Sequence, residues 1–353
     1  MPPDPNAGGG DFALSLATEP MEARTAEALP REDGAWQYEP KWDGFRCLAH
    51  KEGSAVDLRA RSGKPLGRYF PEMLQALAAL PVDRFVLDGE LVIEQAGKVA
   101  FDALQMRLHP AESRIRKLSL ETPAELILFD MLADAAGNLL VDAPLRERRK
   151  ALEAMVKALP KSPRFRLSPY TLDVEEAEGW LADAGRGSTD GVVAKRRAAP
   201  YTPGERSMIK VKHLRTADCV VGGFRYESGA PLVGSLLLGL YDEAGLLNHV
   251  GYTSTITNAE RPTLTKRLEA LREPPGFTGS SPGGPSRWST ERTAEWEPLR
   301  PELVVEVRFD HITGDRFRHG TKLLRWRPDK APRQCTFEQL APPTRNAPGR
   351  GGV

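Results

Sequence analysis

The sequence predicts an α+β protein of two domains, a first domain that mixes strands with helices and a second that is a small β-barrel. The chain has 353 residues, which is enough for two domains that each bury their own core. Short apolar strands alternate with amphipathic helices as far as about residue 212. From residue 219 onward the pattern changes to several short strands and one helix.

Composition excludes several classes of protein. Hydrophobic residues make up 40% and charged residues 27%, values that do not fit a disordered or fibrous chain. No apolar run approaches the ~20 residues that a membrane span needs, and the N-terminus lacks the order of a secretory signal. We therefore expect a cytoplasmic protein. Three widely spaced cysteines indicate neither disulfides nor a zinc site, and a net charge of +1 still allows a local basic surface.

One lysine has surroundings that suit a nucleophile. Lys41 lies in the stretch Glu39-Pro40-Lys41-Trp42-Asp43-Gly44-Phe45-Arg46, which we interpret as an apolar turn relieved by glycine. An ordinary lysine has a pKa near ~10.4, so burial or neighbouring cations must lower this pKa before the amine can attack. The plain alternative is a surface lysine in a hairpin.

Four further stretches carry charged side chains of interest, three of them in apolar strands and one as two arginines ahead of a Ser-Gly turn, which suits binding of an anion. The segment 85–93 carries Asp88-Gly89-Glu90, and carboxylates inside such a strand are costly unless they are paired or bind a metal. In Met208–Lys212 the period of two places Lys210 and Lys212 on one face. The other two stretches are Arg59-Ala60-Arg61-Ser62-Gly63 and Asp190-Gly191-Val192-Val193-Ala194-Lys195. Solvated surface charge is the alternative for each taken alone.

The second domain has features of a nucleic-acid platform. Strands are expected over 219–226, 234–242, 247–253 and 302–309, and a helix after Asn258 as its N-cap. Short strands with one helix suit an OB-fold barrel. The run Arg316 to Lys330 interleaves cations with aromatic residues, which suits a phosphate backbone and exposed bases.

In their order along the chain, these motifs resemble the covalent nucleotidyltransferase superfamily and, within it, ATP-dependent DNA ligases. Single motifs of this kind are weak, but six in the family order are a strong joint signal. Asp190 departs from the pattern, because the fourth motif usually begins with glutamate. The stretch 216–223 is most similar to bacterial DNA ligase C. The six matching elements are Lys41-Trp42-Asp43-Gly44, Arg61 with its turn, Asp88-Gly89-Glu90 followed by Leu128-Phe129-Asp130, Asp190 to Lys195, Lys210-Val211-Lys212, and Arg325-Trp326-Arg327-Pro328-Asp329-Lys330.

The resemblance implies a domain order. We expect a disordered leader over 1–12 and an adenylation domain of ATP-grasp-like antiparallel sheets with helices over 13–214. An OB-fold barrel over 215–340 and a disordered tail over 341–353 would follow. The boundary near residues 213–218 is then expected to be a hinge.

The resemblance also implies the chemistry and its residues. A ligase attaches AMP from ATP to its lysine, passes AMP to the 5′-phosphate of a nick, and lets the 3′-hydroxyl displace it. Lys41 would be the nucleophile, with Lys210 and Lys212 at the α-phosphate. Mg²⁺, or alternatively Mn²⁺, would bind Glu90 and Asp190. The residues implied to bind ATP are Glu39, Arg46, Arg61, Glu90, Phe129, Val193, Lys210, Lys212, Arg327 and Lys330.

Two other functions stay open from sequence alone. RNA ligation or RNA capping belongs to the same superfamily, and a non-catalytic nucleic-acid binder with a decayed pocket belongs to another class. The intact Lys41, Glu90, Lys210 and Lys330 argue against decay. The expected substrate is nicked double-stranded DNA, the candidate protein partners are a repair polymerase or an end-binding protein, and we expect a monomer that does not bind membranes.

Overall fold

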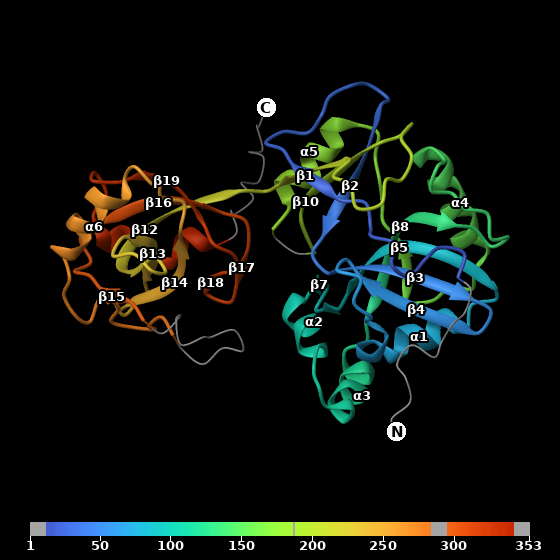
Figure 1. Ribbon diagram of the computed structural model, residues 1–353, viewed down its shortest axis with the longest axis horizontal. Coiled ribbons are helices and arrows are strands. Elements are labelled where there is room, and N and C mark those ends of the chain that lie inside the picture. Colours follow the sequence, from blue (N-terminus) through green and yellow to red (C-terminus); the bar gives the residue numbers. More distant parts are fainter. Residues whose placement is uncertain (1–11, 186–187, 284–294, 342–353) are drawn as a thin grey trace, which may run out of the picture. The chain divides into compact units, whose positions relative to one another are not determined.

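The computed structural model describes residues 12–185, 188–283 and 295–341. The predicted leader and tail lie outside these residues, except for residues 12 and 341. None of the described helices is both long enough and apolar enough to cross a membrane. The chain divides into two compact units, Met1–His213 and Leu214–Val353, coloured blue to green and yellow to red in Figure 1.

The first unit contains two main sheets (Figure 1). Strand order is β4-β3-β5-β8-β9 in the larger sheet and β1-β11-β10-β2 in the smaller one. Neighbouring strands are antiparallel, except that β8–β9 and β1–β11 are parallel. The strands are β1 (Ala23–Thr25), β2 (Trp36–Trp42), β3 (Phe45–Glu52), β4 (Ala55–Ala60), β5 (Arg84–Val92), β8 (Glu125–Ala133), β9 (Phe165–Leu167), β10 (Thr189–Arg196) and β11 (Met208–Lys212), with a short hairpin of β6 (Glu94–Gln95) and β7 (Lys98–Val99).

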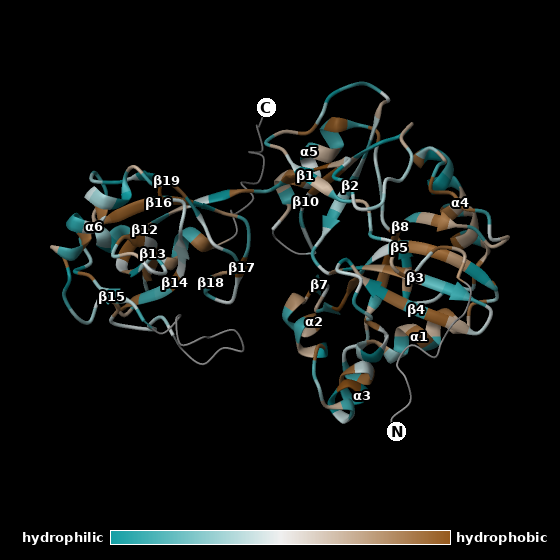
Figure 2. Cartoon of the chain, in the orientation of Figure 1, coloured by the Kyte–Doolittle hydropathy of each residue, from teal (hydrophilic) through white to brown (hydrophobic). Residues whose placement is uncertain are grey.

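Helices cover these sheets. Helix α1 packs on β4, α4 packs on β8, and α5 packs on both β10 and β2. Figure 2 shows hydrophobic stretches along β5 and β8, where Phe85, Leu87, Leu126 and Leu128 are buried in one core. The helices are α1 (Pro71–Ala78), α2 (Phe101–Arg107), α3 (Glu112–Glu121), α4 (Leu145–Ala158) and α5 (Val174–Asp183).

The chain crosses from the smaller to the larger sheet immediately after Lys41. Strand β2 ends at Trp42 and belongs to the smaller sheet, whereas β3 begins at Phe45 and belongs to the larger one. Lys41 is therefore part of a strand, and the predicted turn occupies only the residues between β2 and β3. Gly44 is required in this turn, because a Cβ there would lie 2.2 Å from the carbonyl oxygen of Leu91.

The second unit is a closed β-structure. Its sheet has the order β14-β13-β12-β16-β19, and β15 also pairs with β12. The two edges meet where Thr253 Oγ1 donates to the Thr321 carbonyl at 2.9 Å and the Thr321 amide donates to Tyr252 at 2.9 Å. Helix α6 packs on β13. The elements are β12 (Arg215–Tyr226), β13 (Val233–Tyr241), β14 (Leu247–Thr253), α6 (Arg261–Glu269), β15 (Glu297–Pro298), β16 (Val304–Phe309), β17 (Ile312–Thr313), β18 (Arg316–Phe317) and β19 (Lys322–Trp326).

The structure corrects one detail of the sequence analysis in this unit. Helix α6 begins at Arg261 after Glu260, so Asn258 is not its N-cap. Thr257 begins the preceding turn instead, because its amide and hydroxyl both donate to Glu260 Oε2, at 3.3 Å and 2.6 Å. The Glu260 side chain thus reaches back to the backbone N–H of Thr257, and no side chain among the described residues caps the first turn of α6.

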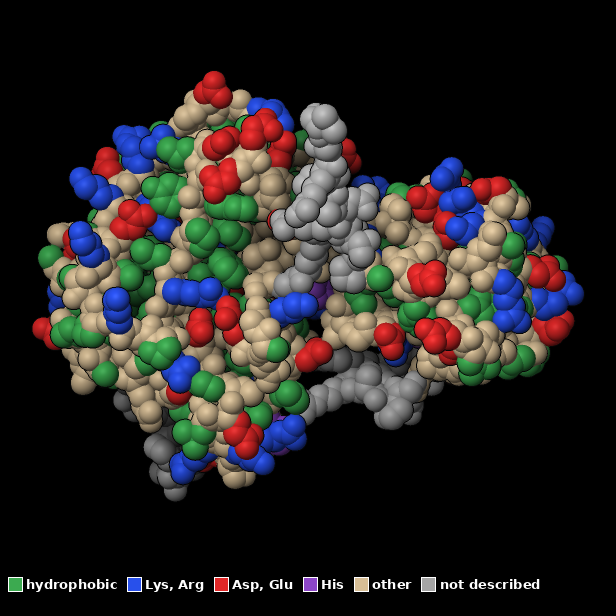
Figure 3. All heavy atoms as spheres, turned by 180° about the vertical axis from the view of Figure 1, so that it is seen from behind, with side chains coloured by type: hydrophobic (Ala, Val, Ile, Leu, Met, Phe, Trp, Pro, Cys, Tyr) green, Lys and Arg blue, Asp and Glu red, His purple; other side chains and the backbone are tan. Residues whose placement is uncertain are grey.

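All three cysteines are buried as free thiols. Burial raises the pKa of Cys47 and Cys219 well above the usual range and that of Cys335 to about 11. On the face drawn in Figure 3, cationic and anionic side chains are interspersed rather than gathered by sign.

Candidate active site

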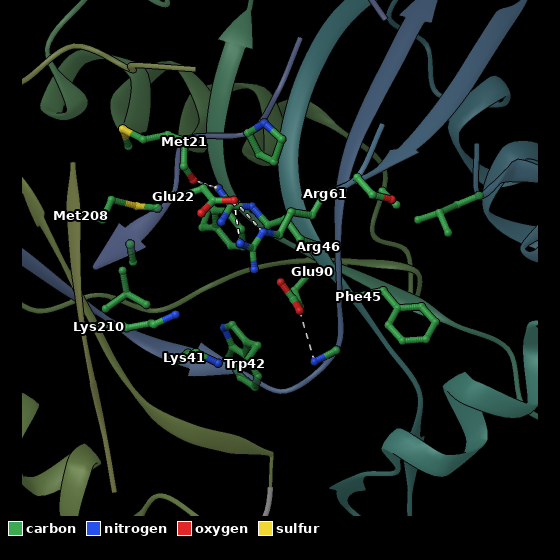
Figure 4. Close-up of a pocket in the computed structure, with 18 of the residues that line it drawn as sticks. Met21, Glu22, Lys41, Trp42, Phe45, Arg46, Arg61, Glu90, Met208 and Lys210 are labelled. Atoms are coloured by element: carbon green, nitrogen blue, oxygen red, sulfur yellow. Dashed lines mark hydrogen bonds and ion pairs between the residues drawn. The ribbon is translucent and has the colours of Figure 1, made fainter. Parts of the chain in front are cut away.

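A cavity of about 1050 Å³ opens in the first unit where the two sheets meet. Its lining comes from both sheets and from the segment before β1, and Figure 4 shows Lys41, Lys210 and Glu90 around it. Segments that are far apart in sequence therefore share one space. The site residues predicted from sequence that line it are Glu39, Lys41, Arg46, Arg61, Glu90, Phe129, Val193 and Lys210.

Lys41 is held by an ion pair with Asp190. Lys41 Nζ lies 2.7 Å from Asp190 Oδ1, and Lys212 Nζ lies 3.3 Å from Asp190 Oδ2. The Asp190 side chain is only 7% exposed, so this carboxylate joins two lysines from β2 and β11 with little competition from water. Lys212 therefore contacts Asp190 beside Lys41 but is not among the residues that line the cavity.

Lys210 contributes a second cation close to Lys41. It pairs with Val193 in the β10–β11 ladder, which places both at the cavity. Burial and the charges of Lys41, Lys212 and Arg61 lower the pKa of Lys210, because like charges disfavour its protonated form. The cavity is therefore rich in positive charge and suited to an anionic ligand.

Glu90 is a half-buried carboxyl group that lines the cavity. Its Oε1 accepts from the Gly44 amide at 3.2 Å, a bond drawn in Figure 4. Burial raises the pKa of Glu90 to about 7, although Arg46 and Lys41 act in the opposite direction. A carboxyl group that loses its proton near neutral pH is ready to accept bonds from ligand hydroxyls or to bind a cation.

Arg46 is bound within the protein to a greater degree than expected. Its Nε and Nη2 each donate to an oxygen of Asp88 at 2.6 Å. Its guanidinium also lies over the Phe129 ring, with Cζ 4.8 Å from the ring centroid. Lys195 Nζ lies 4.5 Å from the same centroid. Arg46 therefore fixes the aromatic wall of the cavity.

Glu39 has partners that the sequence analysis did not identify. Lys195 Nζ contacts Glu39 Oε2 at 2.8 Å, and Gln37 Nε2 donates to Glu39 Oε1 at 2.8 Å. Lys195 could have been singled out as the cation that ends its motif. Arg61 forms an ion pair with Glu22 at 2.7 Å. The segment Pro20–Ala23, which contains Glu22, also lines the cavity, and no motif in the sequence indicated this placement.

Arg327 and Lys330 lie in the second unit, where they share one carboxylate. Arg327 Nη1 lies 2.8 Å from Asp218 Oδ1, and Lys330 Nζ lies 3.2 Å from Asp218 Oδ2. Arg327 also binds Asp329 at 2.9 Å. The backbone of Asp218 is itself held by the Gln339 side chain. The Asp218 amide donates to Gln339 Oε1 at 2.9 Å, and the Asp218 carbonyl accepts from Gln339 Nε2 at 3.1 Å.

Comparison with known proteins identifies the family. The family described as ATP dependent DNA ligase domain matches residues 17–212, and ATP dependent DNA ligase C terminal region matches residues 229–330. DNA ligase C1 of Mycolicibacterium smegmatis is 44% identical, covering 94% of this chain and 96% of that protein. DNA ligase C of Mycobacterium tuberculosis is 41% identical, covering 92% and 94%.

A solved structure shares the fold. The structure titled "DNA binding with a minimal scaffold: Structure-function analysis of Lig E DNA ligases" has a TM-score of 0.56 and 18% identity, covering 87% of this chain and 99% of that chain. The cavity, the ordered motifs and these matches lead to one conclusion. The chain belongs to the family of ATP-dependent DNA ligases.

Proposed function

We propose that Lys41 is the residue that becomes adenylated when this ligase seals a nick. Lys41 Nζ attacks the α-phosphorus of ATP, a P–N bond forms, and the bond to the β-phosphate breaks to release pyrophosphate. AMP then passes to the 5′-phosphate of the nick, and the 3′-hydroxyl displaces AMP. The observation that carries this proposal is that Lys41, Lys210, Glu90 and Phe129 line one cavity.

The amine must lose a proton before it attacks. Asp190 Oδ1, at 2.7 Å from Lys41 Nζ, is placed to accept that proton. Lys210 and Lys212 then stabilise the negative charge that develops on the α-phosphate. Positioning and charge neutralisation supply most of the acceleration in such a transfer.

The remaining residues of the cavity bind the nucleotide. Phe129 and Val193 hold the two faces of adenine, with Glu39 beside them. Arg61 contacts ribose and phosphates, and Glu90 accepts from the ribose hydroxyls, roles that match guanidinium and carboxylate chemistry. Arg46 is also assigned to the ribose and phosphates. Its guanidinium is bound to Asp88 and lies over Phe129, so its main role is to hold Phe129 in place.

Pyrophosphate is proposed to be oriented by Arg327 and Lys330. Both are donors that suit a phosphate group, and both lie in the second unit. Their participation would bring the second unit to the nucleotide during the cycle, with residues 213–218 as the proposed hinge.

A divalent cation fits the donor set in part. Among the described residues there is no group of three His, Cys, Asp or Glu side chains that could hold a metal. Asp190 already forms ion pairs with two lysines. The Glu90 carboxyl has a pKa of about 7 and faces the cavity. Glu90 and Asp190 would hold Mg²⁺ or Mn²⁺ together with oxygen atoms of the substrate and water. Such an ion would neutralise phosphate charge.

The substrate is proposed to be a nick in double-stranded DNA, with a role in DNA repair. A repair polymerase or an end-binding protein would be the partner, and the enzyme would act as a monomer. Comparison of nicked DNA with nicked RNA, and of ATP with GTP, separates DNA ligation from RNA ligation or capping.

The direct test is an adduct assay. Incubation with labelled ATP and magnesium should give a covalent AMP adduct, which mass spectrometry maps to Lys41. Lys41→Arg should abolish it while it keeps the positive charge beside Asp190, and Lys117→Ala on the exposed face of α3 should not. An adduct that persists in Lys41→Arg would refute the assignment of the nucleophile.

A further inference from the structure

A closed ring of hydrogen bonds lies behind one wall of the cavity. The Tyr201 hydroxyl donates to Asp88 Oδ2 at 2.7 Å and accepts from the Met21 amide at 2.9 Å. Asp88 accepts from Arg46 through both oxygens at 2.6 Å, and Arg46 Nη2 donates to the Met21 carbonyl at 3.3 Å. Both backbone groups of Met21 are therefore held by side chains that are anchored on Asp88.

The ring fixes one end of a wall segment. Pro20–Ala23 lines the cavity, and its far end is bound where the Glu22 amide donates to the Glu205 carbonyl at 2.7 Å. The Met208 amide donates to the Glu22 carbonyl at 3.1 Å, and β1 then continues along β11. Glu22 also pairs with Arg61, which lines the cavity as well. The position of Pro20–Ala23 therefore affects the placement of Arg61 in addition to that of Met21.

Three of the four members of the ring are shielded from water, and the fourth, Arg46, has a side chain that is 20% exposed. Tyr201 is 3% exposed, Asp88 0% and Met21 5%. Burial and the charge of Asp88 raise the pKa of the Tyr201 hydroxyl well above its usual value, so the hydroxyl remains a donor throughout the assay range. Removal of one member of a buried ring leaves several polar groups without partners, because water cannot replace it freely.

We propose that Tyr201 is a positioning residue for lysine adenylation, whose hydroxyl holds Pro20–Ala23 as a wall of the cavity and so sets the affinity for ATP. This inference rests on the proposed adenylation of Lys41 in this cavity. Tyr201 is not part of the lining, so it acts through Met21 and Arg46 rather than on the nucleotide itself.

The test separates binding from chemistry. Tyr201→Phe keeps the ring of the side chain and removes only the hydroxyl. Enzyme freed of bound AMP by pyrophosphate and magnesium is mixed with labelled ATP, and adduct formation is followed in single turnovers over a range of ATP concentrations. We expect the half-saturating ATP concentration to rise about tenfold and the maximal rate to stay within about twofold, since the change affects ground-state binding.

Two further measurements distinguish positioning from general damage. Sealing of a nick that already carries AMP needs no ATP, and it should be unchanged in Tyr201→Phe. Tyr38→Phe is the matched control, because Tyr38 is 2% exposed and its hydroxyl donates to the Pro30 carbonyl at 2.6 Å, outside the cavity lining. It should leave the half-saturating concentration at the wild-type value.

A second variant guards against misfolding of the first. Met21→Ala keeps the backbone groups of the ring but shortens the wall, and it too should raise the half-saturating ATP concentration without lowering the maximal rate. The proposal is overturned if Tyr201→Phe behaves like Tyr38→Phe, or if its maximal rate and nick sealing fall together with ATP affinity. Absence of any adduct on Lys41 in the wild type would instead refute the proposed function.

Discussion

Two carboxyl groups near Lys41 have different partners. Asp190 lies between Lys41 and Lys212, whereas Glu90 is half-buried and accepts a hydrogen bond from the Gly44 amide. Burial disfavours the charged form of the Glu90 carboxyl group, and the charges of Arg46 and Lys41 offset this only in part. The pKa of Glu90 rises to about 7 for this reason.

A pH dependence of stability follows from Glu90. Between its unfolded pKa of 4.5 and its folded pKa of about 7, the native state binds more protons than the unfolded state, so stability falls as pH rises through this window. Glu90→Gln removes the effect. The variant should gain about 2 kcal/mol on the wild type between pH 5 and pH 8.

Urea unfolding of both proteins in the absence of metal and nucleotide measures this difference. The two free energies of unfolding should diverge as pH increases, with the variant the more stable at pH 8. Parallel curves from pH 5 to pH 8 would show that Glu90 is not held near neutrality in the free enzyme.

The sequence located individual residues better than their partners. Residue type and spacing indicated Lys41, Glu90 and Lys210, because a charged group in an apolar strand is costly unless it is paired, hydrogen-bonded or used to bind a ligand. The pairing of Arg46 with Asp88 and the bond from the Tyr201 hydroxyl to Asp88 could not be predicted, since the first joins two strands and the second joins a strand to a distant loop through tertiary packing. Spacing along the chain carries no such information.

At the scale of elements, the turn between β2 and β3 links the two sheets at the cavity. A Cβ on Gly44 would lie 2.2 Å from the Leu91 carbonyl oxygen and 2.9 Å from Glu90 Cγ. Gly44→Ala should therefore separate the turn from β5, destabilise the protein by about 2 kcal/mol and slow adduct formation. Chemical unfolding and the labelled-ATP assay measure the two effects.

Gly179→Ala is the matched control for this variant. Gly179 lies within α5, and a Cβ there would meet nothing within 4 Å. Alanine favours a helix more than glycine does, so this change should leave the adduct rate unaltered and add up to about 1 kcal/mol of stability. Equal behaviour of the two variants would show that close packing at Gly44 does not matter.

Several strands and helices could be predicted from the sequence pattern, whereas helix α3 could not. The strands over 85–93 and 208–212 and the helix near 144–159 stand out through apolar runs, alternation or a charged face. Helix α3 was not predicted, because in Glu112–Glu121 only Ile115 and Ser119 are buried. Such a helix gives little apolar period to detect.

For the whole molecule, the division of labour between the units is testable. Arg327→Ala should slow formation of the lysyl adduct by at least about 100-fold, because it removes a guanidinium that is proposed to orient pyrophosphate. Sealing of a pre-adenylated nick should fall by no more than about tenfold, since no pyrophosphate leaves in that step.

Arg333→Ala controls for loss of an arginine from the same unit. Arg333 donates to the Gly245 carbonyl at 2.7 Å and lies over Tyr241, so it is engaged locally. Both reactions should continue at the wild-type rate in this variant. Equal losses of adduct formation and sealing in Arg327→Ala would indicate general damage to the second unit.

The buried thiols have a practical consequence for the study of this enzyme. Because Cys47, Cys219 and Cys335 are buried and their pKa values are raised, maleimide dyes should not react with them in the folded protein. One new surface cysteine on each unit would then carry a donor and an acceptor fluorophore without prior removal of the natural residues. Energy transfer between the dyes could follow the motions of a working ligase in real time.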